Sequence, residues 1–177
     1  MDWPGNKLWI VFALAILVVG CGEKGHPSDA DMIRKFNDHR DEFDTLVSMF
    51  KEDRSLGRVG ANFTRTSNFF EKCSGKDAWE GSEIEVTRER LHDYDKRFAD
   101  LGLTAGIEGY CEKESIVLYA STRGLSVTGS SKGYAYLGQP PKIITDNLDS
   151  YWSEDGRSFT AYRHIDGNWY LYFDYED

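Results

Sequence analysis

Residues 159–175, FTAYRHIDGNWYLYFDY, give the clearest structural signal in this chain of 177 residues. Aromatic and β-branched residues are dense on both sides of Asp166-Gly167, and that dipeptide is typical of a two-residue β-hairpin loop. We therefore predict an antiparallel hairpin whose strands cover 157–165 and 168–175, with Ile165 opposite Asn168.

This register would divide the hairpin side chains between two faces of a sheet. The face predicted to lie against helices would carry Thr160, Tyr162, His164, Trp169, Leu171 and Phe173. The other face would carry Phe159, Ala161, Arg163, Tyr170, Tyr172 and Asp174. Aromatic rings beside a guanidinium suit contacts with a peptide, a glycan or a protein. We therefore take Phe159, Arg163, Tyr170 and Tyr172 as a candidate partner-binding patch, with ordinary sheet packing of tyrosines as the alternative.

The rest of the second half also has the composition of a sheet. Nine of the ten tyrosines lie beyond residue 109, and glycines, serines and Pro140-Pro141 separate the apolar runs. The further strands that we predict cover 105–110, 115–121, 125–128 and 133–137. Residues 129–133, GSSKG, are interpreted as a flexible turn that leads into Tyr134.

The first half predicts two helices. From Met32 to Phe50 the apolar residues recur at helical spacing, and Ser28 can cap the start of this helix. A second helix would begin after Thr87 and end at Gly102. Residues 51–85 are difficult to assign, although 58–65 are compatible with a strand.

Together these elements predict an α+β domain. Two helices would cover one face of a curved antiparallel sheet of about five to six strands. A cone-like fold with a ligand cavity is the alternative architecture.

The N-terminus carries a targeting signal. Lys7 precedes an apolar run from Leu8 to Val19, which is shorter than the roughly 20 residues that a membrane-spanning helix needs. The run fits the hydrophobic region of a secretion signal. Its ending, Val18-Val19-Gly20-Cys21, resembles the lipobox of bacterial lipoproteins. An uncleaved signal anchor is the alternative.

The resemblance covers residues 1–21 and implies that Cys21 is lipidated and becomes the first residue of the mature chain. Residues 1–20 would then be the signal peptide, 21–28 the lipidated cysteine and a flexible tether, and 29–177 one globular domain. A thioether-linked diacylglycerol with an N-acyl chain would hold the protein at the membrane essentially permanently. Gly22 stands where an aspartate retains many Gram-negative lipoproteins in the inner membrane, which favours the outer membrane, facing the periplasm.

Two cysteines remain, Cys73 and Cys111, in a compartment that permits disulfides. A disulfide between them would stabilise the fold by roughly 3 to 4 kcal/mol in the chain-entropy model. Two buried thiols or a metal site are the alternatives. The metal site is disfavoured because the chain has neither a CxxC pair nor histidines at ligand spacing, and we expect no metal or other cofactor.

The charge balance limits the partners. The formal net charge is -9, and Asp2 and Lys7 of the signal segment cancel, so the mature chain keeps it. Such a surface repels phosphate groups, which argues against nucleic acid and leaves the lipid as the expected membrane contact. The acidic stretches 146–149 and 154–156 lack the alternating oxygen ligands of a calcium loop, so we interpret them as solvated turns.

Catalytic patterns are sparse. Residues 129–133, GSSKG, are interpreted as a turn and not as a serine nucleophile, and His164 is the one histidine on a predicted strand. The main hypothesis is a noncatalytic, lipid-anchored envelope protein that binds another protein or an envelope component through its sheet or its acidic surface. An immunity or exclusion lipoprotein that neutralises an incoming toxin is one version. The alternative is an anchored periplasmic hydrolase with a site near His164. No family resemblance is found for residues 22–177.

Overall fold

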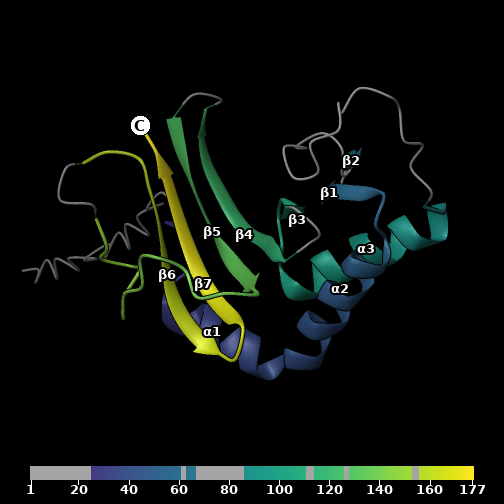
Figure 1. Cartoon of the computed structure of the whole chain (residues 1–177), viewed down its shortest axis with the longest axis horizontal. Coiled ribbons are helices and arrows are strands. Elements are labelled where there is room, and N and C mark those ends of the chain that lie inside the picture. Colours follow the sequence, from purple (N-terminus) through teal and green to yellow (C-terminus); the bar gives the residue numbers. More distant parts are fainter. Residues whose placement is uncertain (1–24, 61–62, 67–85, 111–113, 126–127, 153–155) are drawn as a thin grey trace, which may run out of the picture.

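The computed structural model describes residues 25–60, 63–66, 86–110, 114–125, 128–152 and 156–177. These residues form three helices and seven strands, which makes the domain α+β (Figure 1). The helices are α1 (Asp29–Asp38), α2 (Arg40–Glu52) and α3 (Arg88–Leu101). The strands are β1 (Leu56–Gly60), β2 (Phe63–Thr66), β3 (Gly106–Tyr110), β4 (Ser115–Leu125), β5 (Thr128–Leu137), β6 (Phe159–Asp166) and β7 (Trp169–Glu176).

The seven strands form one antiparallel sheet in the order β2-β1-β3-β4-β5-β7-β6. Figure 1 shows the long strands β4, β5 and β7 bending along their length, with the helices behind and below them. The predicted architecture, with helices on one face of a curved antiparallel sheet, is therefore confirmed.

The helix predicted over 32–50 is two helices, which corrects the sequence interpretation. The chain departs from helical geometry at His39, where φ is -130° and ψ is 29°. Asn37 and Asp38 precede the break, and short polar side chains compete with the helix backbone for hydrogen bonds. The apolar face nevertheless continues across the break, because the rings of Phe36 and Phe43 lie 5.3 Å apart.

Helix α3 has the predicted ends. The Thr87 hydroxyl accepts a hydrogen bond from the Arg90 amide at 3.2 Å, and Gly102 ends the helix in the left-handed conformation with φ at 67°. Asp53, just after α2, accepts hydrogen bonds from the Arg90 guanidinium and the Tyr94 hydroxyl at 2.8 and 2.7 Å. These bonds attach α3 to the end of α2.

The core between the helices and the sheet is strongly aromatic. Phe43 lies 4.5 Å from the ring of Tyr134 on β5 and 5.7 Å from that of Trp169 on β7. All three side chains are at most 1 % exposed. The indole N–H of Trp169 donates to Asp44 at 2.9 Å, so the one polar atom of this ring has a hydrogen-bond partner at the edge of the core.

Two strand predictions need correction. Strand β4 runs continuously from Ser115 to Leu125, where the sequence suggested two shorter strands. Residues 129–133, predicted as a flexible turn, lie inside β5 and pair with both β4 and β7. The possible strand over 58–65 is a hairpin of β1 and β2.

The hairpin of β6 and β7 exists, but its register differs from the prediction by one residue. Asp166 pairs with Trp169 and His164 pairs with Tyr170, so Ile165 is an extra residue on β6. Such a bulge moves every side chain beyond it to the other face of the sheet. The predicted pairing of Ile165 with Asn168 is therefore wrong.

Candidate functional site

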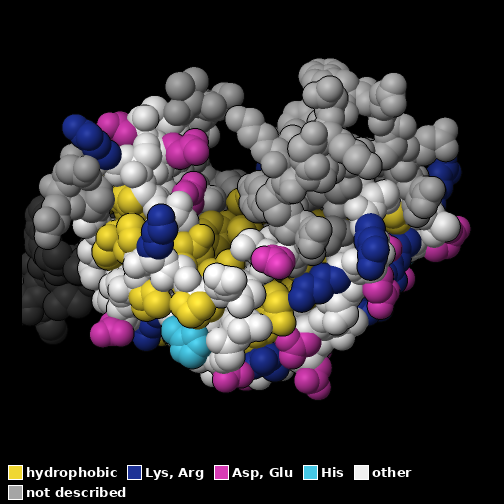
Figure 2. All heavy atoms as spheres, viewed as in Figure 1, with side chains coloured by type: hydrophobic (Ala, Val, Ile, Leu, Met, Phe, Trp, Pro, Cys, Tyr) yellow, Lys and Arg dark blue, Asp and Glu magenta, His cyan; other side chains and the backbone are white. Residues whose placement is uncertain are grey.

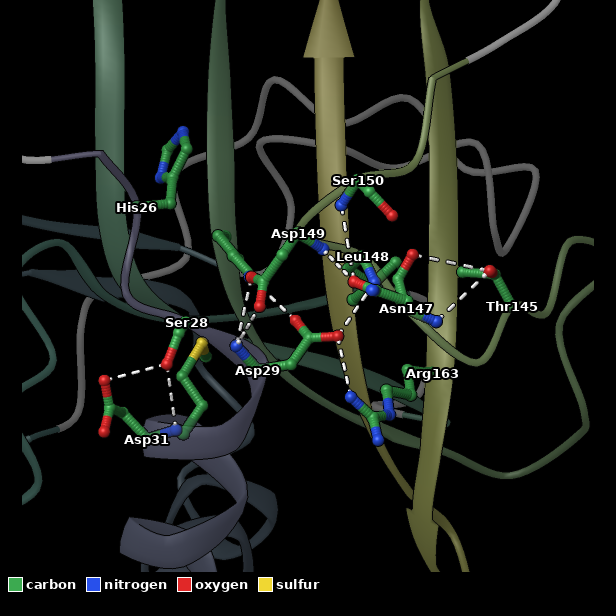
Figure 3. Close-up of polar contacts among 12 residues, drawn as sticks. His26, Ser28, Asp29, Asp31, Thr145, Asn147, Leu148, Asp149, Ser150 and Arg163 are labelled. Atoms are coloured by element: carbon green, nitrogen blue, oxygen red, sulfur yellow. Dashed lines mark hydrogen bonds and ion pairs between the residues drawn. The ribbon is translucent and has the colours of Figure 1, made fainter.

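Two regions of the sheet combine side chains from distant parts of the chain. The first lies on the helix side, where α1 begins, and centres on a buried carboxylate (Figure 3). Asp29 is 2.7 Å from Lys132 of β5 and 3.0 Å from Arg163 of β6, measured from carboxylate oxygen to side-chain nitrogen. Lys132 also contacts Asp149 at 2.5 Å. We call Asp29, Lys132, Asp149 and Arg163 the Asp29 cluster.

The loop between β5 and β6 completes this cluster through its backbone. The Leu148 amide donates to Asp29 at 2.8 Å, and the Asp29 amide donates to both carboxylate oxygens of Asp149 at 3.0 Å. Asp149 thereby accepts one of the otherwise unpaired amides at the start of α1. In Figure 3 the Asp149 carboxylate and the Leu148 amide lie against Asp29 at the first turn of the helix. The cluster joins a helix, two strands and a loop at one point.

The cluster lowers the pKa of Asp29. Burial raises this pKa, but the hydrogen bonds from Lys132, the Leu148 amide and Arg163 outweigh burial and hold it below its usual value. The amine of Lys132 lies between the carboxylates of Asp29 and Asp149, and this geometry suits a structural role for Lys132.

His26 lies on the same face, although the sequence placed it in a flexible tether. Its Nδ1 is 2.5 Å from the Ser121 hydroxyl and its Nε2 is 2.7 Å from the Ser130 hydroxyl. Its ring also contacts Phe173 at 5.5 Å. Burial, with smaller contributions from Arg123 and Lys132, lowers the pKa of His26 to about 4. The imidazole is therefore neutral at neutral pH and attaches the start of the domain to β4 and β5.

The second region is the sheet face opposite the helices. Three side chains on it, Val117, Tyr119 and Tyr162, are partly exposed and surround a buried layer. That layer consists of Ala135, Leu137, Tyr170 and Tyr172. Figure 2 shows hydrophobic side chains gathered across this face, between charged groups at its margins. We call Val117, Tyr119 and Tyr162 with this layer the open face.

The tyrosines of the open face pack edge to face. Tyr119 and Tyr172 are 6.1 Å apart at an interplanar angle of 88°, and Tyr162 and Tyr170 are 6.3 Å apart at 85°. The Tyr119 hydroxyl donates to Glu108 at 2.5 Å, and the Arg58 guanidinium lies 4.8 Å from the centre of the Tyr119 ring. These contacts fix the orientation of the rings.

The predicted four-residue patch does not form. The bulge at Ile165 places Phe159 and Arg163 beside Tyr175 and Leu171 on the helix side, and Arg163 there belongs to the Asp29 cluster. Tyr170 and Tyr172 lie on the opposite face and are only 6 % and 3 % exposed. Figure 1 shows the start of the loop after β5 crossing that face in front of β7 and β6.

Other predicted site residues have mixed outcomes. Cys21, Cys73 and Cys111 lie outside the described residues. His164 is exposed at the hairpin end, where its Nε2 is 3.0 Å from the Gly167 carbonyl oxygen. Asp149 lies exposed in a turn, as predicted, and its carboxylate also belongs to the Asp29 cluster.

Asp29 and Lys132 were not predicted to be partners. Asp29 is interpretable locally as an acid in the first turn of a helix, and Lys132 as part of a polar turn. Even on an assigned strand a lysine is ordinarily exposed, so no local signal indicates that Lys132 is buried. The pairing of the two residues depends on tertiary structure.

Among the described residues, no group of histidines, cysteines and acids could hold a metal ion. In that same part of the chain, no helix has the length and apolar character needed to cross a membrane. No protein-family model, curated protein or solved structure matches this chain.

Proposed function

We propose that this chain is a bacterial lipoprotein, acylated at Cys21 and held at the outer membrane facing the periplasm, whose domain binds a protein partner noncatalytically through the open face. The sequence Leu17-Val18-Val19-Gly20-Cys21 supports the anchor. The partly exposed aromatic side chains of the open face are the observation that supports binding.

The physical argument for binding is preorganisation. Tyr119 and Tyr162 each pack edge to face on a buried tyrosine, so their rings lose little conformational freedom when a partner covers them. Tyrosine is enriched among residues that contribute most to protein interfaces, because it combines apolar area with a hydrogen-bonding hydroxyl. The guanidinium of Arg58 lies over the Tyr119 ring and pairs with Glu108 at 3.4 Å, which further fixes the ring.

The anchor is tested on the mature chain purified from the membrane of a Gram-negative host. Intact mass should show loss of residues 1–20 and addition of acyl chains, and Cys21→Ala should abolish both. An unmodified Cys21, or retention of the signal segment, would contradict this part of the proposal.

The binding surface is tested with a photo-crosslinking amino acid in the full, lipidated chain. Crosslinks to one and the same partner are expected from positions 119 and 162. Lys96, exposed on α3, is the control position and should give none. Crosslinking from Lys96 but from neither tyrosine position would assign binding to another surface.

We further propose that Cys73 and Cys111 form a disulfide in the periplasm. Alkylation before and after reduction, followed by intact mass measurement, distinguishes a disulfide from two thiols. Alkylation of both cysteines without reduction would exclude the bond.

A further inference from the structure

The point at which the described chain begins limits how the domain can sit above a membrane. His26 contacts Ser121, Ser130 and Phe173 on the helix-side face of the sheet. Cys21 precedes His26 by only five residues. A fully extended chain covers at most about 3.6 Å per residue, so His26 lies within roughly 18 Å of Cys21. With Cys21 acylated, this part of the sheet must stay close to the bilayer.

Beside His26 the sheet carries a group of aromatic side chains. Phe173, which contacts His26, lies 5.6 Å from Phe159, and Phe159 lies 5.8 Å from Trp152. Trp152 also lies 4.6 Å from Tyr175. Trp152 is 55 % exposed, and it is one of the exposed large hydrophobic residues in the described part of the chain. We call Trp152, Phe159 and Tyr175 the aromatic rim.

Tryptophan and tyrosine concentrate where a membrane meets water, because their rings are apolar and their N–H and O–H groups remain hydrated. An exposed tryptophan on a folded domain is unremarkable by itself. Here it coincides with the place where the chain must approach the bilayer. The rim and the short connection to Cys21 therefore point to the same surface.

We propose that the aromatic rim rests on the bilayer to which Cys21 is anchored, with Trp152 in the headgroup region. This inference rests on the proposed lipidation. The net charge of -9, and the exposed Glu176 and Asp177 next to Tyr175, oppose binding to anionic lipid. The aromatic rim therefore contacts the interfacial zone of a bilayer of zwitterionic phospholipid. The open face lies on the opposite side of the sheet and stays available to a protein partner.

The test uses the mature, lipidated chain in vesicles of phosphatidylethanolamine and phosphatidylcholine. Some of the phosphatidylcholine carries a spin label on its headgroup, which quenches nearby tryptophan fluorescence. We expect label-dependent quenching in the natural chain and loss of most of it in Trp152→Phe. The double variant W152F/K96W adds a tryptophan on α3 to Trp79 and the buried Trp169, and its quenching should not exceed that of W152F because α3 lies away from the rim.

Failure of the anchor and failure of the rim give different results. Vesicle flotation and intact mass report lipidation independently of fluorescence, and a chain without lipid overturns both proposals. A lipidated, vesicle-bound chain whose quenching is the same in the natural form and in W152F overturns the rim and leaves the anchor intact. Quenching of W152F/K96W equal to that of the natural chain would also overturn the rim, because it would place α3 at the membrane.

Discussion

Asp29 and Lys132 form an ion pair in the interior, with 2.7 Å between Oδ1 and Nζ and side chains that are 2 % and 3 % exposed. They come from the first turn of α1 and the middle of β5, and Arg163 and Asp149 add a further cation and anion. Buried ion pairs cost desolvation energy, and removal of one partner leaves a charge without compensation. The pair therefore affects the stability of the fold most when one of its two partners is removed.

We predict that Lys132→Met lowers the free energy of unfolding by about 3 kcal/mol or more. Asp29 would keep its bond to Arg163 but lose its nearest cation. Chemical denaturation at neutral pH measures the effect, and Lys142→Met, which removes an exposed lysine, should change stability by about 0.5 kcal/mol at most. The double variant D29N/K132M should cost less than the sum of its single changes. Equal stability of Lys132→Met and Lys142→Met would show that the buried pair is not formed.

The Asp29 cluster also predicts acid sensitivity. The pKa of Asp29 is lowered in the folded state, because the hydrogen bonds to its carboxylate outweigh the effect of burial. An aspartate in the unfolded chain has a pKa of about 3.9. The stabilisation is therefore complete above that unfolded value and is lost as the pH falls through the folded pKa. We expect Asp29→Asn to show a flatter decline of unfolding free energy below about pH 4. Asp38→Asn, an exposed acid on the same helix, should decline like the natural chain.

His26 predicts a change at higher pH. Its pKa is about 4 in the folded state, and about 6.5 is usual for an unfolded chain, so the unfolded state binds the proton more readily. Stability is then greatest above about pH 6.5 and decreases as the pH falls toward 4. His26→Gln should remove this part of the pH dependence, whereas His92→Gln, exposed on α3, should keep it. A proton NMR titration that finds an ordinary pKa for the His26 ring would contradict the prediction.

The parts of the fold that depend on neighbouring residues in the sequence were predictable. Thr87 and Gly102 mark the ends of α3, and Asp166-Gly167 marks the last hairpin, because capping and turn geometry need particular residue types nearby. The break at His39 was missed because the apolar stripe continues through it. Local patterns therefore predict the order of the helices and strands more reliably than they predict where one helix is interrupted.

The candidate site was less predictable because it depends on register and on distant pairs. One extra residue, Ile165, moved Phe159 and Arg163 to the helix side, and no turn or strand signal in the sequence marks this bulge. Lys132 lies among serines and glycines that favour a turn. Its burial becomes favourable only when Asp29 and Asp149 arrive from elsewhere in the chain.

Gly133 of β5, which pairs with Tyr172 of the open face, gives the most local prediction. A β-carbon built on Gly133 would lie 2.0 Å from the Leu118 carbonyl oxygen and 2.7 Å from Cε1 of Tyr172. The first contact is with backbone, which cannot move aside without disturbing the pairing of β4 and β5. Gly133→Ala should therefore lower the free energy of unfolding by about 2 kcal/mol or more.

The control for this prediction is Gly25→Ala. A β-carbon on Gly25 meets nothing within 4 Å, so this variant should leave the free energy of unfolding unchanged. Because Tyr172 supports Tyr119, Gly133→Ala should also weaken crosslinking from position 119 at a temperature where the variant is still folded. A fully stable Gly133→Ala would mean that β4 and β5 are further apart than described.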